Sequence, residues 1–150
     1  MTNPNWLLSA RAHFPSLNEA NCELTSPPDE GYNCIAWAAE DTDRWWWPDP
    51  IEQQFWPTDA PRIESVEAFV AAFALLGYIE RADTTAEANK QKVAIFVDQN
   101  GKPTHAARQL SNGRWTSKLG RQVDIAHQLS ALEGEQYGTV AVVLARARGI

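Results

Sequence analysis

The chain has 150 residues, 44% of them hydrophobic and 21% charged, as expected for one ordinary globular domain spanning residues 1–150. Its 19 acidic and 13 basic side chains give a net charge of −6, which argues against a nucleic-acid partner because phosphate binding needs clustered Lys and Arg. No apolar run is long enough to span a membrane and the start lacks a secretory signal, so we expect no membrane partner and a cytoplasmic location.

The first third of the chain predicts two short helices. Residues 5–13 place apolar side chains on one helical face, and Pro15 ends that helix. A loop is expected over residues 16–31. The second helix begins at Cys34, where Asn33 or the turn before it can provide the N-cap.

The middle of the chain predicts an irregular segment followed by a longer helix. Residues 45–61 contain four prolines and four of the seven tryptophans, so we expect a loop that its aromatic rings pack onto the core. Apolar residues recur at helical spacing over residues 63–76, and Gly77 is placed to end that helix.

The remainder predicts a sheet. Strands are expected at 93–98, 104–110, 114–119 and 137–145, with turns at Asn100-Gly101 and Asn112-Gly113, and a helix at 124–132. The last strand has the continuous apolar run of a strand buried on both faces. Helices followed by strands predict an α+β fold in which N-terminal helices pack on a mostly antiparallel sheet.

Two residues point to a chemical function. Cys34 is predicted at a helix N-terminus, where unpaired N–H groups and the helix dipole favour a thiolate. His105 is the one histidine predicted within a strand. A nearby imidazole can accept the thiol proton and return it to a leaving group, so this pair predicts a cysteine nucleophile with a general base.

A third polar residue is expected to orient the imidazole from the next strand. If the second hairpin has a two-residue loop, Thr116 lies on the face of His105; a loop longer by one residue places Ser117 there instead. Asp124, just after the hairpin, is a third candidate. A hydroxyl is sufficient to fix an imidazole tautomer.

This layout resembles the papain-like superfamily, and within it the NlpC/P60-type cysteine peptidases and amidases. The resemblance rests on Tyr32-Asn33-Cys34-Ile35-Ala36-Trp37, on Thr104-His105-Ala106-Ala107 and on the strand around Ser117. It implies a papain-like fold with Cys34 as nucleophile, His105 as base and Ser117 as the polar partner. The Asp-Cys-Ser-Gly signature of NlpC/P60 proteins is not present. The motif wording is also similar to a family of uncharacterised bacterial proteins.

Substrate-binding candidates lie near Cys34. Trp37 follows it by three residues and can form a wall of the site. The side chain of Asn33, Asn21 or Tyr32 can donate to an oxyanion beside the Cys34 N–H. Core packing is the competing interpretation of Trp37. Arg108 and Lys118 can each recognise a substrate carboxylate or simply pair with surface charges.

The remaining cysteine and histidines are assigned no catalytic part. Cys22 and Cys34 are expected to be free thiols, and no spacing typical of zinc ligands is present, so neither a metal nor a cofactor is expected. His127, on the predicted helix 124–132, is expected to be exposed or to cap a helix. His13 is placed to interact with a helix C-terminus.

Two functions follow from these observations. The first is a thiol hydrolase, such as a peptidase, amidase or deamidase, that acts on a peptide, a protein or a small amide through Cys34 and His105. The second is a non-catalytic protein-binding module that uses the tryptophan-rich loop as its contact surface. An exposed aromatic patch, or a Cys34 buried away from any histidine, would favour the second function. The sequence leaves the substrate and the oligomeric state open.

Overall fold

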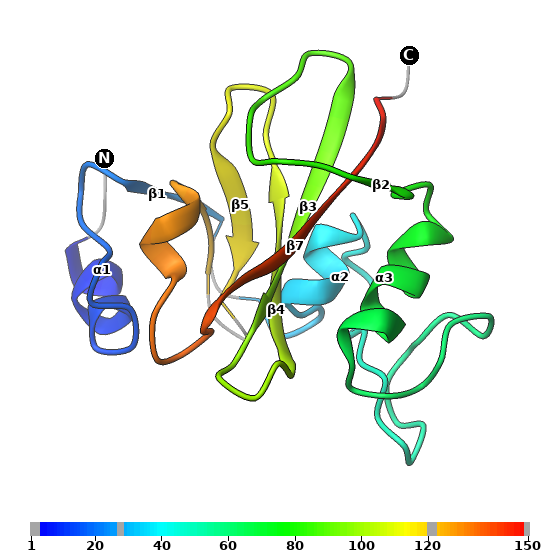
Figure 1. Cartoon of the computed structure of the whole chain (residues 1–150). Coiled ribbons are helices and arrows are strands. Elements are labelled where there is room, and N and C mark those ends of the chain that lie inside the picture. Colours follow the sequence, from blue (N-terminus) through cyan, green and yellow to red (C-terminus); the bar gives the residue numbers. More distant parts are fainter. Residues whose placement is uncertain (1–3, 27–28, 120–122, 149–150) are drawn as a thin grey trace.

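The computed structural model describes residues 4–26, 29–119 and 123–148, which form a single sheet with short helices on both faces (Figure 1). All paired strands are antiparallel, in the order β1-β6-β5-β4-β3-β7-β2. The strands are β1 (Cys22–Ser26), β2 (Glu80–Arg81), β3 (Lys90–Val97), β4 (Pro103–Gln109), β5 (Trp115–Lys118), β6 (Asp124–His127) and β7 (Thr139–Ala147).

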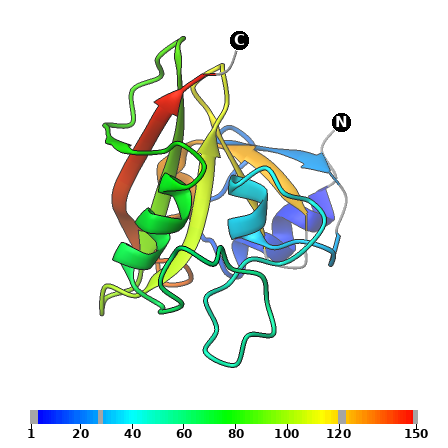
Figure 2. The ribbon, with the colours of Figure 1, turned by 90° about the vertical axis from the view of Figure 1, so that its right-hand side faces the viewer.

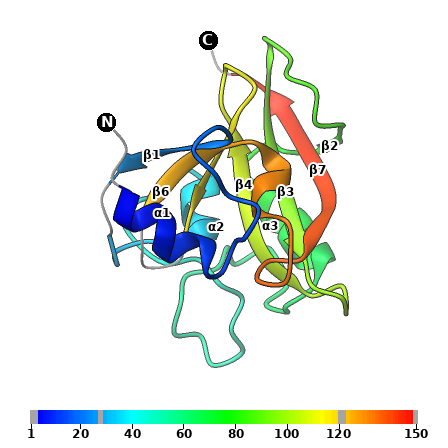
Figure 3. The same cartoon turned by 90° about the vertical axis from the view of Figure 1, so that its left-hand side faces the viewer.

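The helices are short. They are α1 (Pro4–Arg11), α2 (Cys34–Ala38), α3 (Val66–Ala74) and the 3-10 helix η1 (Leu129–Leu132). The predicted papain-like α+β arrangement, with N-terminal helices packed as a layer on the sheet, is therefore wrong. The described residues form mostly a seven-stranded antiparallel sheet, and α1 and α2 lie on opposite sides of it (Figures 2 and 3).

The sheet separates two hydrophobic cores. On one face, α2, α3 and the tryptophan-rich segment cover Val93, Ile95 and Ala106. On the other face, α1 and η1 cover side chains that include Phe96 and Ala107. Because side chains alternate along a strand, neighbouring residues of β4 belong to different cores.

Capping residues fix where α2 and α3 begin. The Asn33 side chain accepts hydrogen bonds from the N–H groups of Ala36 and Trp46, and it donates to the Trp46 carbonyl. Asn33 therefore both starts α2 and anchors the tryptophan-rich segment. The side chain of Ser65 caps α3 by accepting from the Ala68 N–H.

The tryptophan-rich segment packs onto the core, as predicted. The rings of Trp46 and Trp56 are buried, and Trp56 lies 5.0 Å from Phe69 of α3. Their indole N–H groups donate to Asp41 and to the Pro61 carbonyl. This segment is thus part of the fold around α3.

The largest errors in the predicted elements lie at the sheet edge farthest from α3. The helix predicted at 124–132 is instead strand β6 followed by η1, and β1 lies within the predicted loop 16–31. The four residues of β6 are all buried, because β1 and β5 flank the strand on both sides. Two further strands lie close to the predictions: β3 at 90–97 and β4 at 103–109.

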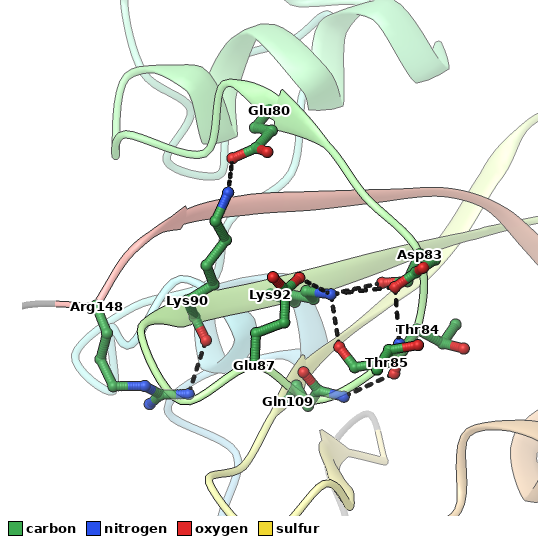
Figure 4. A network of polar contacts seen from close by, with 9 residues as sticks. All are labelled: Glu80, Asp83, Thr84, Thr85, Glu87, Lys90, Lys92, Gln109 and Arg148. Atoms are coloured by element: carbon green, nitrogen blue, oxygen red, sulfur yellow. Dashed lines mark hydrogen bonds and ion pairs between the residues drawn. The ribbon is translucent and has the colours of Figure 1, made fainter.

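A loop between β2 and β3 is tied to the sheet by polar contacts (Figure 4). The Lys92 ammonium is buried and donates to the carbonyls of Asp83 and Thr85, and it pairs with Glu87 at 2.7 Å. The Gln109 amide donates to the Thr84 carbonyl. No helix among the described residues is both long and apolar enough to cross a bilayer.

Candidate functional site

Cys34 is the first residue of α2, and it is buried where α2 crosses β4 and β5. The backbone N–H groups of Ala106, Ile35 and Cys34 itself lie near enough to the sulfur to favour its charged form. Ala106 directly follows His105 in β4, so the sulfur lies against the peptide next to the histidine.

The sulfur is a neutral thiol at physiological pH. Burial raises the pKa of Cys34 to about 11, although the three N–H groups and the Lys118 charge act in the opposite direction. The favourable position at a helix start is therefore outweighed by desolvation. A thiolate would form only together with a proton acceptor.

β4 lies between Cys34 and His105. Ala106 belongs to the core of α2, whereas His105 contacts Phe96 in the core of α1, with ring centroids 5.1 Å apart. The side chains of Ala106 and His105 thus point to opposite faces of β4, and Cys34 packs on the Ala106 face. Among the described residues, no hydrogen bond joins Cys34 to His105.

The sheet opens at this position. β4 and β5 pair at Arg108↔Thr116 and at Gln109↔Trp115, and beyond these pairs toward Ala106 the described residues of the two strands do not pair. The Ala106 N–H, which acts on the Cys34 sulfur, lies in this unpaired part of β4. The sulfur and the imidazole therefore lie on either side of this unpaired part of β4 and β5, which we call the split.

His105 begins a line of three hydrogen-bonded side chains on the face of α1. Its Nε2 lies 2.9 Å from the Ser117 Oγ, and that oxygen lies 2.7 Å from the Nε2 of His127. The Nδ1 of His127 is 2.7 Å from the Gln128 carbonyl oxygen. All three side chains are buried.

The carbonyl at one end fixes the direction of every hydrogen bond in this line. A carbonyl can only accept, so His127 carries its proton on Nδ1 and its Nε2 is an acceptor. The Ser117 hydroxyl then donates to His127 and accepts from the Nε2–H of His105. The His105 Nδ1 is left with a lone pair, and it has no hydrogen-bond partner among the described residues.

Both imidazoles are neutral in the folded protein. Burial lowers the pKa of His127 to about 4, against a smaller opposite effect of the Gln128 carbonyl. Burial also lowers the pKa of His105 well below its ordinary value, and the charge of His127 adds to this effect. A neutral imidazole with a free lone pair is the form that a general base requires.

Tyr137 packs against His105 and lies near enough to Cys34 for the two groups to interact electrostatically. Its ring stacks on the His105 imidazole at 3.9 Å between centroids and 10° between planes. Burial and the nearby Cys34 charge together raise the pKa of Tyr137 well above its ordinary value. Its ring is half-buried, so Tyr137 is the part of this group closest to solvent.

The other candidate orienters of His105 lie elsewhere. Thr116 faces α2, where its hydroxyl accepts from the Trp37 indole at 2.9 Å. Asp124 accepts from Thr25 and from the Tyr32 hydroxyl. The loop of the second hairpin is one residue longer than two, since Gln109 pairs with Trp115, and this places Ser117 on the face of His105.

The predicted substrate-binding residues are largely engaged within the fold. All three hydrogen bonds of the Asn33 amide are structural, so the side chain is not available to an oxyanion. Tyr32 is buried and stacks on Trp37 at 5.5 Å. Trp37 is half-buried, and both rings lie on the face of Cys34.

Lys118 lies on the same face of the sheet. Its ammonium donates to the Asp29 carbonyl and lies 5.0 Å from the Tyr32 ring. Burial lowers the pKa of Lys118, whereas Asp29, Asp124 and Cys34 act to raise it. Lys118 thus supplies positive charge near the sulfur.

The sequence prediction missed two residues of this group, His127 and Tyr137. The signal for His127 was weak, because Ile125, Leu129 and Leu132 imitate helical spacing although strand and 3-10 helix divide them. Tyr137 lies in a tight loop closed by mutual hydrogen bonds between Gly134 and Gly138. Nothing local in the sequence indicates that its ring meets a histidine 32 residues away.

Metal ligation finds no support in the described part of the chain. No group of three or more His, Cys, Asp and Glu side chains there is arranged to hold an ion. Cys22 is a free, buried thiol whose Sγ donates to the Asn18 carbonyl. The chemistry available at the split is therefore that of a thiol, an imidazole line and backbone N–H groups.

Comparison with known proteins gives a family without an assigned activity. No curated protein and no solved structure matches the chain. One family model, described as Domain of unknown function (DUF7689), matches residues 23–145, which include every residue of the group around Cys34. Since this match covers most of its length, the chain belongs to the DUF7689 family.

Proposed function

We propose that this protein is a thiol-dependent hydrolase of amide bonds, with Cys34 as nucleophile and His105 as general base. The observation that carries the proposal is the unpartnered Nδ1 lone pair of His105, next in β4 to Ala106, which shares a core cluster with Cys34. A buried, unpaired acceptor costs free energy, so we infer that Nδ1 accepts a proton when the protein acts. In the proposal, the Cys34 thiol supplies that proton.

The proposed reaction begins from neutral groups. The Nδ1 of His105 takes the thiol proton while sulfur bonds to the substrate carbonyl carbon, and the carbonyl oxygen becomes an oxyanion. In the proposal, the N–H groups of Cys34 and Ala106 would donate to that oxyanion. The imidazolium then protonates the leaving amine as the carbon–nitrogen bond breaks, and water hydrolyses the thioester by the same route.

Ser117 and His127 would act as positioning residues. Their hydrogen bonds hold the proton of His105 on Nε2 and so keep Nδ1 free. When Nδ1 accepts a proton, the bond from Nε2–H to Ser117 becomes charge-assisted and strengthens. A relationship of this chemistry to the NlpC/P60-type peptidases is part of the proposal.

The proposal requires a local movement. Cys34 of α2 lies against one face of β4 and the His105 side chain lies on the other face, so the sulfur must move into the split between β4 and β5 to reach Nδ1. Lack of strand pairing at this position makes such a movement less costly than it would be in a closed ladder. The half-buried Tyr137 ring marks the side from which a substrate would enter.

Alkylation kinetics test this proposal. The rate of iodoacetamide labelling at Cys34 is measured from pH 5 to 10 by mass spectrometry, with Cys22 as a buried internal reference. Since the thiol is neutral and would lose its proton to His105 only as the sulfur reacts, we expect His105→Asn to slow labelling at neutral pH at least about tenfold. His13→Gln, at an exposed histidine, is the matched control and leaves the rate unchanged. Labelling of Cys34 that is insensitive to His105 refutes the proposal.

The second candidate function is a non-catalytic binding module, and the burial of Cys34 is the observation that favours it. Its proposed contact surface is weakened by the packing of the tryptophan-rich segment, where Trp46 and Trp56 are buried. The same alkylation profile separates the two functions, because a binding module needs no activated sulfur. We also propose a cytoplasmic location, in keeping with two unpaired cysteines.

A further inference from the structure

Arg108 stands out among the basic side chains as a half-buried cation without a counter-ion. The other half-buried or buried Lys and Arg side chains of the described residues make an ion pair or donate to a carbonyl: Arg62, Lys90, Lys92, Arg114, Lys118, Arg146 and Arg148. Arg108 makes no such contact there, and its Nε is a buried donor without an acceptor. In a chain with 19 acidic side chains against 13 basic ones, an unpaired arginine is unexpected.

The surroundings of Arg108 hold its guanidinium in place without neutralising it. The guanidinium carbon lies 5.5 Å from the centroid of the Trp37 ring, and Thr116, the cross-strand partner of Arg108, binds the indole of that same tryptophan. This contact orients the side chain through cation–π attraction and leaves the N–H groups available.

Two more arginines lie on the same face of the sheet. The guanidinium carbon of Arg146 lies 4.4 Å from the Tyr78 ring centroid, and Arg148 donates to the side chain of Gln91, which is opposite Arg146 in the ladder. One carboxylate, that of Glu40, pairs with Arg146 at 2.9 Å. Three positive charges thus face one negative charge here.

A second orphaned polar atom lies in this group. The Tyr78 hydroxyl is buried and has no hydrogen-bond partner among the described residues. Burial raises the pKa of this phenol to about 12, and the charges of Arg146, Arg108 and Arg148 act in the opposite direction. Two unsatisfied donors beside an excess of positive charge are features of an anion-binding site without its ligand.

We propose that Arg108 and Trp37 form a binding site for a small oxyanion, a carboxylate or a phosphate group. The Arg108 guanidinium would donate two parallel hydrogen bonds to the oxyanion. Trp37 forms the apolar wall. This site does not depend on the reactivity of Cys34.

The location of the site gives it a use in the proposed hydrolase. Trp37 is three residues beyond Cys34 in α2, and Arg108 is three residues beyond His105 in β4. One helical turn spans about 5.4 Å, so a ligand anchored at Arg108 can place a nearby amide at the sulfur. A substrate with an anionic group close to the scissile amide is the class that this arrangement fits.

Nitrogen-15 NMR of the arginine Nε–H groups in the full-length protein tests the site. Inorganic phosphate and acetate are titrated separately at constant ionic strength. We expect a saturable shift of the Arg108 resonance, with a dissociation constant on the order of millimolar, for at least one anion. Saturation by phosphate assigns a phosphate ligand, and saturation by acetate a carboxylate. A shift that does not saturate with either anion refutes the site.

Substitutions complete the test. Arg108→Gln should weaken binding at least about tenfold, and Arg108→Lys, which keeps the charge and loses the planar fork, should weaken it less. Arg81→Gln, on the exposed strand β2, is the control and should leave binding unchanged. Because Arg108 has no counter-ion, Arg108→Gln should not lower the melting temperature. Full binding in Arg108→Gln, or loss in Arg81→Gln, overturns the proposal. Binding that persists in Cys34→Ser keeps this inference separate from the hydrolase.

Discussion

The two buried imidazoles predict a specific loss of stability in mild acid. Above pH 6.5, His105 and His127 are neutral in both folded and unfolded chains, so the free energy of unfolding does not depend on them. Below pH 6.5 the unfolded chain binds two protons. The folded chain binds none until the pH approaches about 4, where His127 titrates. Stability therefore falls as the pH decreases from 6.5.

The magnitude follows from the linkage between proton binding and folding. At pH 5.5, one unit below the ordinary histidine pKa, each imidazole kept neutral costs about 1.4 kcal/mol, or roughly 3 kcal/mol for both. This is a large share of the ~5–15 kcal/mol that stabilises a typical domain. Most carboxyl groups titrate below this window, so the two histidines account for the slope.

Urea unfolding between pH 8 and 5.5 measures the effect. His127→Gln should reduce the loss to roughly 1.5 kcal/mol, since one buried imidazole remains. His13→Gln, at an exposed position, should leave the full loss in place. Long-range nitrogen–proton NMR should place the single ring proton on Nδ1 of His127 and on Nε2 of His105. A stability that is flat over this range, or equal losses in all three proteins, would show that these imidazoles are not buried in neutral form.

Two further predictions concern the scaffold. Gly138→Ala should lower the free energy of unfolding by more than about 3 kcal/mol, because φ is +79° and a Cβ would lie 1.9 Å from the Val97 carbonyl oxygen. Gly101→Ala, at φ +77° with no atom within 4 Å of a Cβ, should lower it by about 1 kcal/mol. Equal destabilisation of the two variants in urea would contradict the close approach at Gly138. Lys92→Ala should cost about 2–3 kcal/mol, mainly because two carbonyls lose their donor, while its exposed carboxylate partners become hydrated. A melting temperature unchanged by Lys92→Ala would show that the loop of Figure 4 does not depend on it.

The sequence predicted well those elements whose signals are local. Asn33 beside Cys34 indicated a helix start, and the structure shows α2 beginning there with Asn33 as its cap. Asn100-Gly101 indicated the turn between β3 and β4. In both cases the residues that set the backbone conformation lie within a few positions of the element itself.

The errors arose where burial depends on distant partners. The residues Asp124–His127 carry no alternation of polar and apolar side chains, because both edges of β6 are paired and both faces are covered. A short strand of this kind cannot be told from a helix by periodicity. The papain-like layering failed for the same reason, since α2 is only five residues long and the sheet extends beyond it to β1.

The candidate site shows the same division between local and distant information. The placement of Ser117 depended on one residue of hairpin length, which the sequence left open and the pairing of Gln109 with Trp115 decides. The direction of the hydrogen bonds depends on the Gln128 carbonyl, a backbone group that no side-chain pattern reveals. That carbonyl determines that His105 carries its proton on Nε2, so that the unpartnered Nδ1 holds a lone pair.

The free nitrogen of His105 and the unpaired guanidinium of Arg108 have one property in common, and it bears on function. Each lowers stability relative to a simpler substitute, because an apolar side chain at 105 or an uncharged one at 108 would leave no polar atom unsatisfied. Native proteins retain such groups mainly where binding or catalysis requires them. The two positions lie three residues apart on β4, on opposite faces of that strand, and α2 packs against the face of Arg108. If each is retained for function, a ligand that spans the split must contact both residues. The effects of the two substitutions on turnover of that ligand should then differ. His105→Asn should lower kcat, whereas Arg108→Gln should raise KM.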